Sequence, residues 1–401
     1  METQSIVLPT ARENLFDPPP ELAALCAAGA PRRLYYADGQ VGWLVTSYDQ
    51  ARRLIADRRF GVIMMQPLVD AETEASIEEA IGGLDDGFVS LKDPPDHTRL
   101  RRAVADRFTP KRVAERRAGI ERIVAGLLDA MERQGPPADL RADFALPIPS
   151  RVICELLGVP PTDEHQFLHP TEVMFDPATT PEEAAAAFYG FADYVREVVE
   201  RKRAEPEDDL LTDLMRSGAL SDLELAGMAM ELFITGHETT ANAIALGALA
   251  LLRDRAAWDA FRADAADPDR VAAWCEELLR FLSIVEQSFT RVAHEDLELD
   301  GAEIRAGERV TVSLLTANHD PAAFPGPDEV SLERGARGHL AFGHGIHKCL
   351  GQHLARVEMQ AALAGLAARL PTLRLATPPA DLPLGSAAEG VYRATELPVT
   401  W

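Results

Sequence analysis

The sequence predicts a mainly α-helical fold with small β-sheets. Apolar residues recur at helical spacing in several long segments, and the longest of these runs from Ser221 to Leu252. Stretches with strand character are short and lie beside turn dipeptides such as Asp38-Gly39 and Asp300-Gly301. The chain has 401 residues, 47% of them hydrophobic, which suffices for a large core in one domain or in two smaller ones.

Composition and charge limit the functional classes. The net charge is −24, from 40 Lys and Arg against 64 Asp and Glu, which argues against general nucleic-acid binding. The four cysteines lie far apart without a CxxC pair, so a disulfide framework is not indicated and a reducing cytoplasm is favoured. The first residues lack the apolar core of a signal peptide. The best apolar run, 241–252, is well short of the roughly 20 residues that cross a bilayer.

The N-terminal part begins with predicted helices over 20–28 and 48–57, and a hairpin formed by strands 33–36 and 41–46 lies between them. From Phe60 to Pro95 the periodicity is lost, and a loop of this length is usually functional or mobile. Its scattered apolar residues are candidates to line a binding site, with ordinary packing as an equal alternative; they are Met64, Met65, Leu68 and Phe88.

A basic helix follows this loop. His97 and Arg101 are four residues apart and therefore face the same side, where two cationic donors can clamp an anion. Such a spacing is nevertheless more often a solvated basic face. Residues 92–117 hold nine Lys and Arg against four acids, so the net charge of this segment is positive although that of the whole chain is negative. We therefore expect part of this segment to dock an acidic partner, with Arg102 and Arg112 as the positions that test it.

The central predicted helix starts with a capping box, because Glu224 follows Ser221 by three residues. Its middle reads Thr235-Gly236-His237-Glu238-Thr239-Thr240. Threonine can bond the carbonyl four residues back, so this stretch is expected to bend the helix and open a pocket. A zinc-protease helix is excluded, since Ala241 stands where the second histidine belongs. Four further helices are predicted upstream, over 116–131, 146–157, 163–174 and 181–203.

The C-terminal third alternates helical and extended stretches. A predicted helix over 271–282 carries Glu277 and Arg280 three residues apart, where they can pair. Residues 283–288 are predicted to be extended, and Glu389–Tyr392 is predicted to form a hairpin tip that reaches a pocket. Short strands are expected between them, at 297–299, 303–304 and 310–314.

Residues Phe342–Gly351 place Cys349 behind a run of glycines, immediately before a predicted helix. Unpaired N–H groups and the dipole at a helix N-terminus stabilise a thiolate, so we expect the pKa of this cysteine to be lowered. A thiolate held in this way can be the axial ligand of a haem. The glycines agree with this, because a flat macrocycle needs close backbone and turns that glycine makes cheaply.

Other interpretations of the same stretch stay open. Gly343-x-Gly345 could begin a dinucleotide-binding loop, although Lys348 stands where a third glycine belongs. A buried structural cysteine is also common, but it would leave the glycines unexplained. A zinc site is a fair competitor, with the ligands His344, His347, Cys349 and His353.

The pattern Phe342-Gly343-x-Gly345-x-His347-x-Cys349-Leu350-Gly351 resembles the cysteine loop of the cytochrome P450 superfamily of haem-thiolate monooxygenases. The resemblance extends from about Tyr48 to the C-terminus. It implies the cytochrome P450 fold, a helical prism with a long central helix over the haem, with residues 1–401 as a single haem domain without a fused reductase. It also implies that Cys349 binds the iron beside Phe342 and Gly351, and that the haem propionates are held by His97, Arg101, Arg291 and His347.

The resemblance implies further roles. Glu238 and Thr239 would bind water linked to dioxygen and relay protons. The chain departs from the family at Thr235, where Ala or Gly is more common, and at Val330 and Ser331, where Phe and Asp are usual. A buried structural network would join Glu277, Arg280 and Arg334. Besides the four loop residues, the substrate pocket would be lined by Phe233, Thr235, Ile284, Val285, Gln287 and Val391.

The implied function is insertion of one oxygen atom from O2, by hydroxylation or epoxidation, into a mid-sized lipophilic substrate such as a macrolide or other polyketide. Glu286 would meet a basic sugar of such a substrate or face water. Heme b is the expected cofactor, and NAD(P)H is the expected electron source through a separate ferredoxin and ferredoxin reductase. We expect a cytoplasmic monomer with no membrane or nucleic-acid partner. The alternative is a non-catalytic haem sensor or carrier, which would have no use for a proton relay.

Overall fold

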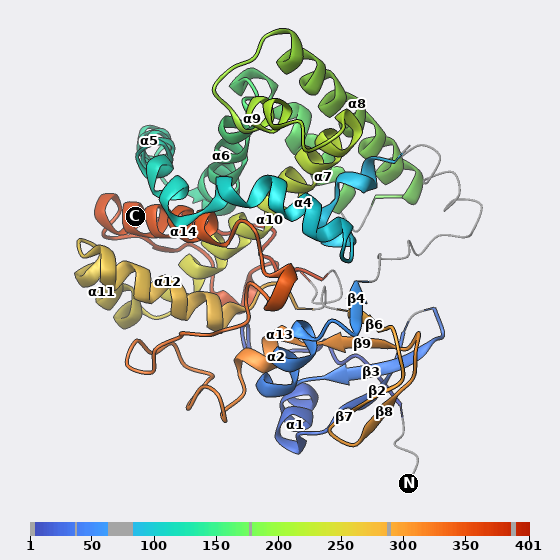
Figure 1. Cartoon of the computed structure of the whole chain (residues 1–401). Coiled ribbons are helices and arrows are strands. Elements are labelled where there is room, and N and C mark those ends of the chain that lie inside the picture. The colour runs from blue at the N-terminus through green and yellow to red at the C-terminus, as the bar shows by residue number, and fades with distance from the viewer. Residues whose placement is uncertain (1–4, 37, 63–82, 176–178, 287–289, 386–389) are drawn as a thin grey trace.

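The helices and strands separate into a helical region and a smaller sheet-containing region (Figure 1). This computed structural model describes residues 5–36, 38–62, 83–175, 179–286, 290–385 and 390–401. The predicted mainly α-helical class with small sheets is confirmed. The helices are α1 (Pro20–Ala28), α2 (Tyr48–Ala56), α4 (Asp96–Ala105), α5 (Pro110–Gln134), α6 (Pro147–Leu157), α7 (His165–Phe175), α8 (Pro181–Ala204), α9 (Leu210–Ser217), α10 (Asp222–Leu252), α11 (Arg255–Asp264), α12 (Pro268–Leu282), α13 (Leu314–Asn318) and α14 (Gln352–Arg369).

The largest sheet has the strand order β1-β2-β3-β9-β6-β4. The predicted hairpin is its β2–β3 pair, in which Arg33 lies opposite Trp43. β9 joins β3 in parallel and β6 antiparallel, so strands from both ends of the chain share one sheet. The strands are β1 (Ile6–Val7), β2 (Arg32–Tyr35), β3 (Val41–Val45), β4 (Phe60–Val62), β5 (Ala138–Asp139), β6 (Thr290–Ala293), β7 (Leu297–Leu299), β8 (Ala302–Ile304), β9 (Arg309–Val312), β10 (Arg374–Leu375) and β11 (Pro398–Thr400).

Some predicted boundaries are wrong. Residues 60–62, which the sequence predicts to be part of a loop, form β4, because they pair with β6. The strand predicted to reach Leu314 stops at Val312, and α13 begins at Leu314 with Ser313 as its N-cap, whose Oγ accepts the N–H of Thr316. α5 is also longer than the predicted 116–131 and starts at a proline, which is favourable in the first turn of a helix.

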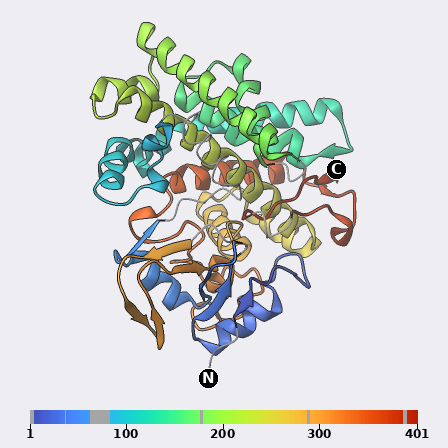
Figure 2. The same cartoon turned by 90° about the vertical axis from the view of Figure 1, so that its right-hand side faces the viewer.

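α10 passes through the middle of the molecule, and the turned view shows helices on both sides of it (Figure 2). Its predicted capping box is present: the Glu224 N–H donates to Ser221 Oγ at 3.2 Å, and the Ser221 N–H donates to Glu224 Oε2 at 2.8 Å. The helix is continuous from Asp222 to Leu252, and most of its residues are buried. Exposed or half-buried positions near its centre therefore mark where it meets an internal space.

A short helical turn, η1 (Leu84–Gly87), packs directly on α10. The two backbones approach so closely that a Cβ on Gly227 would lie 1.9 Å from the Leu84 carbonyl oxygen. The next turn, η2 (Val89–Leu91), is held by Glu231 of α10, whose carboxylate accepts the N–H groups of Val89 and Ser90 at 2.7 Å each. The loop that carries Phe88 is thus fixed to the central helix.

Glu277 and Arg280 form a buried bidentate ion pair on α12, with contacts of 2.8 and 3.0 Å. Arg280 also donates to the carbonyls of Asn318 and Pro327, and Glu277 accepts the Ser331 N–H at 3.0 Å. Arg334 lies 3.7 Å from Glu277. This network ties α12 to the segment that leads into the cysteine loop.

Candidate haem site

The cysteine loop is a tight turn followed by the start of α14. The Cys349 N–H donates to the Phe342 carbonyl at 2.9 Å, which closes the loop. Gly343 and Gly345 have positive φ angles of 67° and 73°, and a Cβ on Gly345 would lie 2.8 Å from the Ile55 carbonyl oxygen. These two positions therefore require glycine. Gly351 does not, since its φ is −78° and a Cβ there would meet open space.

Cys349 differs from the other three cysteines, which are buried, because it is exposed. Burial in the surrounding chain nevertheless raises the pKa of its thiol, while the N–H groups of Gly351 and Gln352 and the guanidinium of Arg101 act to lower that pKa. The expectation that the helix N-terminus would lower the pKa is therefore corrected: desolvation outweighs it. Cys349 is therefore an exposed residue whose thiol is nevertheless surrounded by protein atoms.

Four cationic or donor side chains gather beside this loop from separate elements: His97 and Arg101 of α4, Arg291 of β6, and His347. The rings of His97 and His347 lie 4.2 Å apart, and Arg101 donates to the Lys348 carbonyl at 2.5 Å. Burial and the three neighbours lower the pKa of His347 to about 3. Among the described residues, neither ring nitrogen of His97 nor Nε2 of His347 has a hydrogen-bond partner of good geometry.

This cluster fits an anionic group. Buried ring nitrogens without hydrogen-bond partners are costly, and the guanidinium groups of Arg101 and Arg291 place positive charge beside the rings of His97 and His347. The acid closest to His347 is Asp93, at 4.0 Å, which is a weak contact. Carboxylates placed among these four side chains would accept hydrogen bonds from the two histidine rings and would balance the charges of the two arginines. An exposed cysteine and, next to it, two arginines with two buried histidine rings together form the donor set that a haem with two propionates requires.

On α10, two threonine hydroxyls face the same side of the helix. Thr239 Oγ1 donates to the Thr235 carbonyl at 2.8 Å, and Thr235 Oγ1 donates to the Glu231 carbonyl at 2.6 Å. Thr235 is exposed although it lies at the middle of a mostly buried helix. The predicted back-bonding of these threonines is therefore present, and it leaves their hydroxyl oxygens able to accept a further hydrogen bond.

Glu238 has partners that the sequence did not indicate. Its Oε1 accepts hydrogen bonds from Arg141 at 2.8 Å and from Asn242 at 3.2 Å. Arg141 starts a short helical turn 97 residues earlier in the chain, so no local pattern could reveal the pair. The carboxylate is thus held by a cation beside Thr239, which is the adjacent residue on α10.

Two of the predicted lining segments meet each other. Val285 and Val391 form an antiparallel bridge, the Tyr392 N–H donates to the Ile284 carbonyl at 2.8 Å, and the Glu286 N–H donates to the Gly390 carbonyl at 3.1 Å. Ile284, Val285 and Val391 are half-buried. Phe88 is half-buried as well and packs against the core.

Two expectations about the pocket are corrected. Phe233 is fully buried and stacks on His237 with a ring separation of 4.9 Å, so it belongs to the core between α10 and α7 and does not line an open space. Glu286 is buried and forms an ion pair with Arg12, so it neither faces water nor is free to meet a basic sugar. Four predicted lining residues lie outside the described part of the chain: Met64, Met65, Leu68 and Gln287.

The zinc interpretation finds no support. Within the part of the chain that the structure describes, no three His, Cys, Asp or Glu side chains come together in a way that could hold a metal ion. His344, His347, Cys349 and His353 are close in sequence but do not converge. His347 instead faces His97, on the side of the cationic cluster.

Fold and site together indicate a haem-thiolate protein. Comparison with known proteins identifies its family. Residues 152–370 match the family model described as Cytochrome P450. Cytochrome P450 105C1 of Streptomyces sp is 44% identical over 99% of this chain and 98% of that protein. The 20-oxo-5-O-mycaminosyltylactone 23-monooxygenase of Streptomyces fradiae is 39% identical over 99% and 93%. The crystal structure of cytochrome P450 MoxA from Nonomuraea recticatena is 38% identical, with a TM-score of 0.86 over 99% of this chain and 98% of that one.

The chain belongs to the cytochrome P450 family. It is a monooxygenase that uses haem-thiolate iron and O2 with electrons derived from NAD(P)H through redox partners. Among the described residues we find no helix with both the length and the apolar character that crossing a bilayer requires.

Proposed function

We propose that this monooxygenase hydroxylates or epoxidises a mid-sized lipophilic secondary metabolite, such as a macrolide or other polyketide. The observation that carries the proposal is the exposed residue Cys349 beside the buried rings of His97 and His347, whose nitrogens lack hydrogen-bond partners of good geometry among the described residues. The half-buried aliphatic pair Val285 and Val391 supports an apolar substrate. The name of the Streptomyces fradiae relative, a tylactone 23-monooxygenase, supports the substrate class.

The residues present fit heme b, which supplies the oxygen-activating chemistry when bound. Cys349 would ligate its iron, with Phe342 and Gly351 alongside. The propionates would accept hydrogen bonds from His97, Arg101, Arg291 and His347. Arg356 lies over the Phe342 ring at 4.4 Å and also pairs with Glu276, which fixes that ring beside the cysteine.

The residues of α10 would manage protons and position substrate. Thr239, whose hydroxyl oxygen remains able to accept, would hold a water molecule and pass its proton toward the haem side. Glu238, which is held by its ion pair with Arg141, would polarise that water. Substrate would rest against Thr235 and Phe88 and the pair of extended segments that contains Ile284, Val285 and Val391.

Electrons would arrive from a ferredoxin that is reduced by a ferredoxin reductase. α4 and α5 flank the cysteine loop and α14, through the Arg101–Lys348 and Arg117–Gln360 hydrogen bonds, and they carry the basic segment. An acidic ferredoxin would be steered to that segment. We further propose that residues 1–401 form one haem domain acting as a cytoplasmic monomer, with neither a membrane nor a nucleic acid as partner.

Carbon monoxide difference spectroscopy tests the iron ligand. The reduced protein should show the red-shifted Soret band of thiolate coordination, and Cys349→Ala should lose this band, whereas Cys154→Ala should retain it because Cys154 is buried and distant in sequence from the loop. A thiolate band that persists in Cys349→Ala would contradict the assignment. Difference spectra with a panel of macrolides and other polyketides would then identify the substrate, and NAD(P)H turnover with a surrogate ferredoxin would distinguish catalysis from haem carriage.

A further inference from the structure

Arg12, in the segment before α1, makes buried contacts far from its own position in the chain. Its guanidinium is paired with the carboxylate of Glu286, and the two side chains are only 7% and 5% exposed. It also lies 4.1 Å from the centre of the Tyr392 ring, over its face. Burial lowers the pKa of Arg12 to about 10, so the guanidinium still carries its charge near neutral pH. We call Arg12, Glu286 and Tyr392 the Arg12 cluster.

The two partners of Arg12 belong to the two extended segments that meet beside the haem site. Glu286 follows Val285 in one segment, and Tyr392 follows Val391 in the other. Backbone hydrogen bonds of 2.8 and 3.1 Å join these segments. Because Arg12 contacts one side chain from each, it fastens both segments at the same point.

Side-chain alternation places the Arg12 cluster behind the lining residues. In extended backbone, successive side chains point to opposite faces. Val285 and Val391 lie directly across from each other, so they share one face. Glu286 and Tyr392 are their neighbours in sequence and project from the other face, toward Arg12. Arg12 can therefore act on the lining face only by positioning it.

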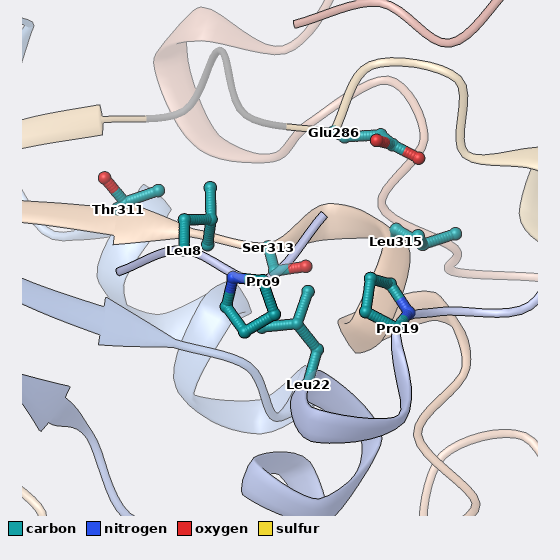
Figure 3. A pocket seen from close by; sticks show the side chains of 8 residues that line it. All are labelled: Leu8, Pro9, Pro19, Leu22, Glu286, Thr311, Ser313 and Leu315. Carbon is teal, nitrogen blue, oxygen red and sulfur yellow. The ribbon is translucent and has the colours of Figure 1, made fainter. Parts of the chain in front are cut away.

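Glu286 depends on Arg12 for a charged partner. Within the described residues, Arg12 is its one ion-pair partner. Glu286 also borders a small gap between the N-terminal segment, α1 and β9 (Figure 3). The remaining residues that line this gap are apolar or uncharged: Leu8, Pro9, Pro19, Leu22, Thr311, Ser313 and Leu315. Without Arg12, a buried carboxylate would be left unpaired, and its segment would have to shift to reach water.

We propose that Arg12 is a positioning residue for substrate recognition. By holding Glu286 and Tyr392 together, it fixes the spacing of Val285 and Val391 and so helps to select which lipophilic molecules fit beside the haem. The inference rests on the proposed function, in which these two valines line the substrate pocket. Arg12 itself touches neither the substrate nor the haem.

The test compares two iron-binding probes in the full-length haem-loaded protein. Imidazole reports on the iron alone, whereas clotrimazole, a bulky lipophilic azole, must also fit the pocket walls. Arg12→Met should bind imidazole as the unmodified protein does but should bind clotrimazole about fivefold more weakly. Arg33→Met is the matched control, because Arg33 likewise pairs with a glutamate, Glu308 at 2.6 Å, and covers an aromatic ring, Trp43 at 4.0 Å, but contacts neither lining segment.

The result that supports the proposal is a changed ratio of clotrimazole to imidazole affinity in Arg12→Met and not in Arg33→Met. An unchanged ratio in Arg12→Met, or an equal change in both variants, overturns it. If Arg12→Met does not fold, the double variant Arg12→Met/Glu286→Met supplies the same comparison, because it removes both charges of the buried ion pair. Loss of the thiolate band in the unmodified protein would instead refute the proposed function, so the two failures are distinguishable.

Discussion

At the residue scale, the hydrogen bonding of the Thr239 hydroxyl limits how this side chain can take part in proton transfer. Its hydroxyl proton is given to the Thr235 carbonyl at 2.8 Å, so only its oxygen is free for a water molecule. The adjacent carboxylate of Glu238 does not contact this hydroxyl but is held by Arg141. We therefore expect a proton that Thr239 delivers to come from a bound water molecule and not directly from Glu238.

Replacing Thr239 by Ala should uncouple oxygen consumption from product formation. Without the hydroxyl, the water that supplies the proton is no longer held, so peroxide is released instead. We expect product formed per NAD(P)H to fall by about tenfold or more, with a matching rise in peroxide. Thr240→Ala is the control, since Thr240 is adjacent but buried at 5% exposure. Equal coupling in Thr239→Ala and the unmodified protein would rule out this role.

At the scale of single elements, the close contact of η1 with α10 is the most constrained feature of the helical region. The carbonyl of Leu84 lies where a Cβ of residue 227 would be, and a Cβ on Gly87 would lie 2.2 Å from the Glu224 carbonyl oxygen. Close packing of the two backbones therefore requires glycine at both positions. Their φ angles do not, because neither glycine has a positive φ. The contact holds the Phe88 loop against the central helix.

Gly227→Ala should destabilise the protein even though alanine is the better helix former. The added methyl group forces the two backbones apart, and overpacking of this kind costs about 2 kcal/mol. Gly126→Ala, in α5, should do the opposite and add about 1 kcal/mol, because a Cβ there meets nothing within 4 Å. Urea unfolding monitored by far-UV circular dichroism would measure both. Equal effects of the two substitutions would show that η1 does not pack on α10 as described.

Elements and local motifs could be predicted because their signals lie within a few residues of each other. The capping box of Ser221 and Glu224 and the back-bonding of Thr239 are examples. Contacts between segments that are distant in sequence could not be predicted. Val89 is 142 residues from Glu231, and Arg141 is 97 residues from Glu238, so neither pair leaves a periodic trace. The prediction for Phe233 failed for a related reason: its face of α10 is covered by α7 and α8, which sequence periodicity does not orient.

At the scale of the whole molecule, charge is distributed unevenly. The chain carries a net charge of −24, yet α4 and α5 present basic residues beside the cysteine loop. Ion pairs neutralise several of these, including Arg99 with Glu224, Arg107 with Asp213 and Arg112 with Glu115. Among the described residues, Arg102, Lys111 and Arg116 have no ion-pair partner. We therefore expect an acidic partner to dock mainly on Arg102, Lys111 and Arg116. A substitution of Arg112, which is paired with Glu115, is a weaker test of that docking.

Reversing one of these charges should slow electron delivery. An acidic ferredoxin is attracted to the unpaired cations, and its association rate depends on that attraction. Arg102→Glu or Arg116→Glu should lower the rate of ferredoxin-dependent reduction by about tenfold at low ionic strength, with a smaller effect in high salt. Stopped-flow reduction under carbon monoxide would measure this. Arg133→Glu is the control: it makes the same charge change on the same helix, about 25 Å from Arg116 at 1.5 Å per residue. If Arg133→Glu slows reduction as much as Arg116→Glu, net charge rather than a docking surface controls the rate.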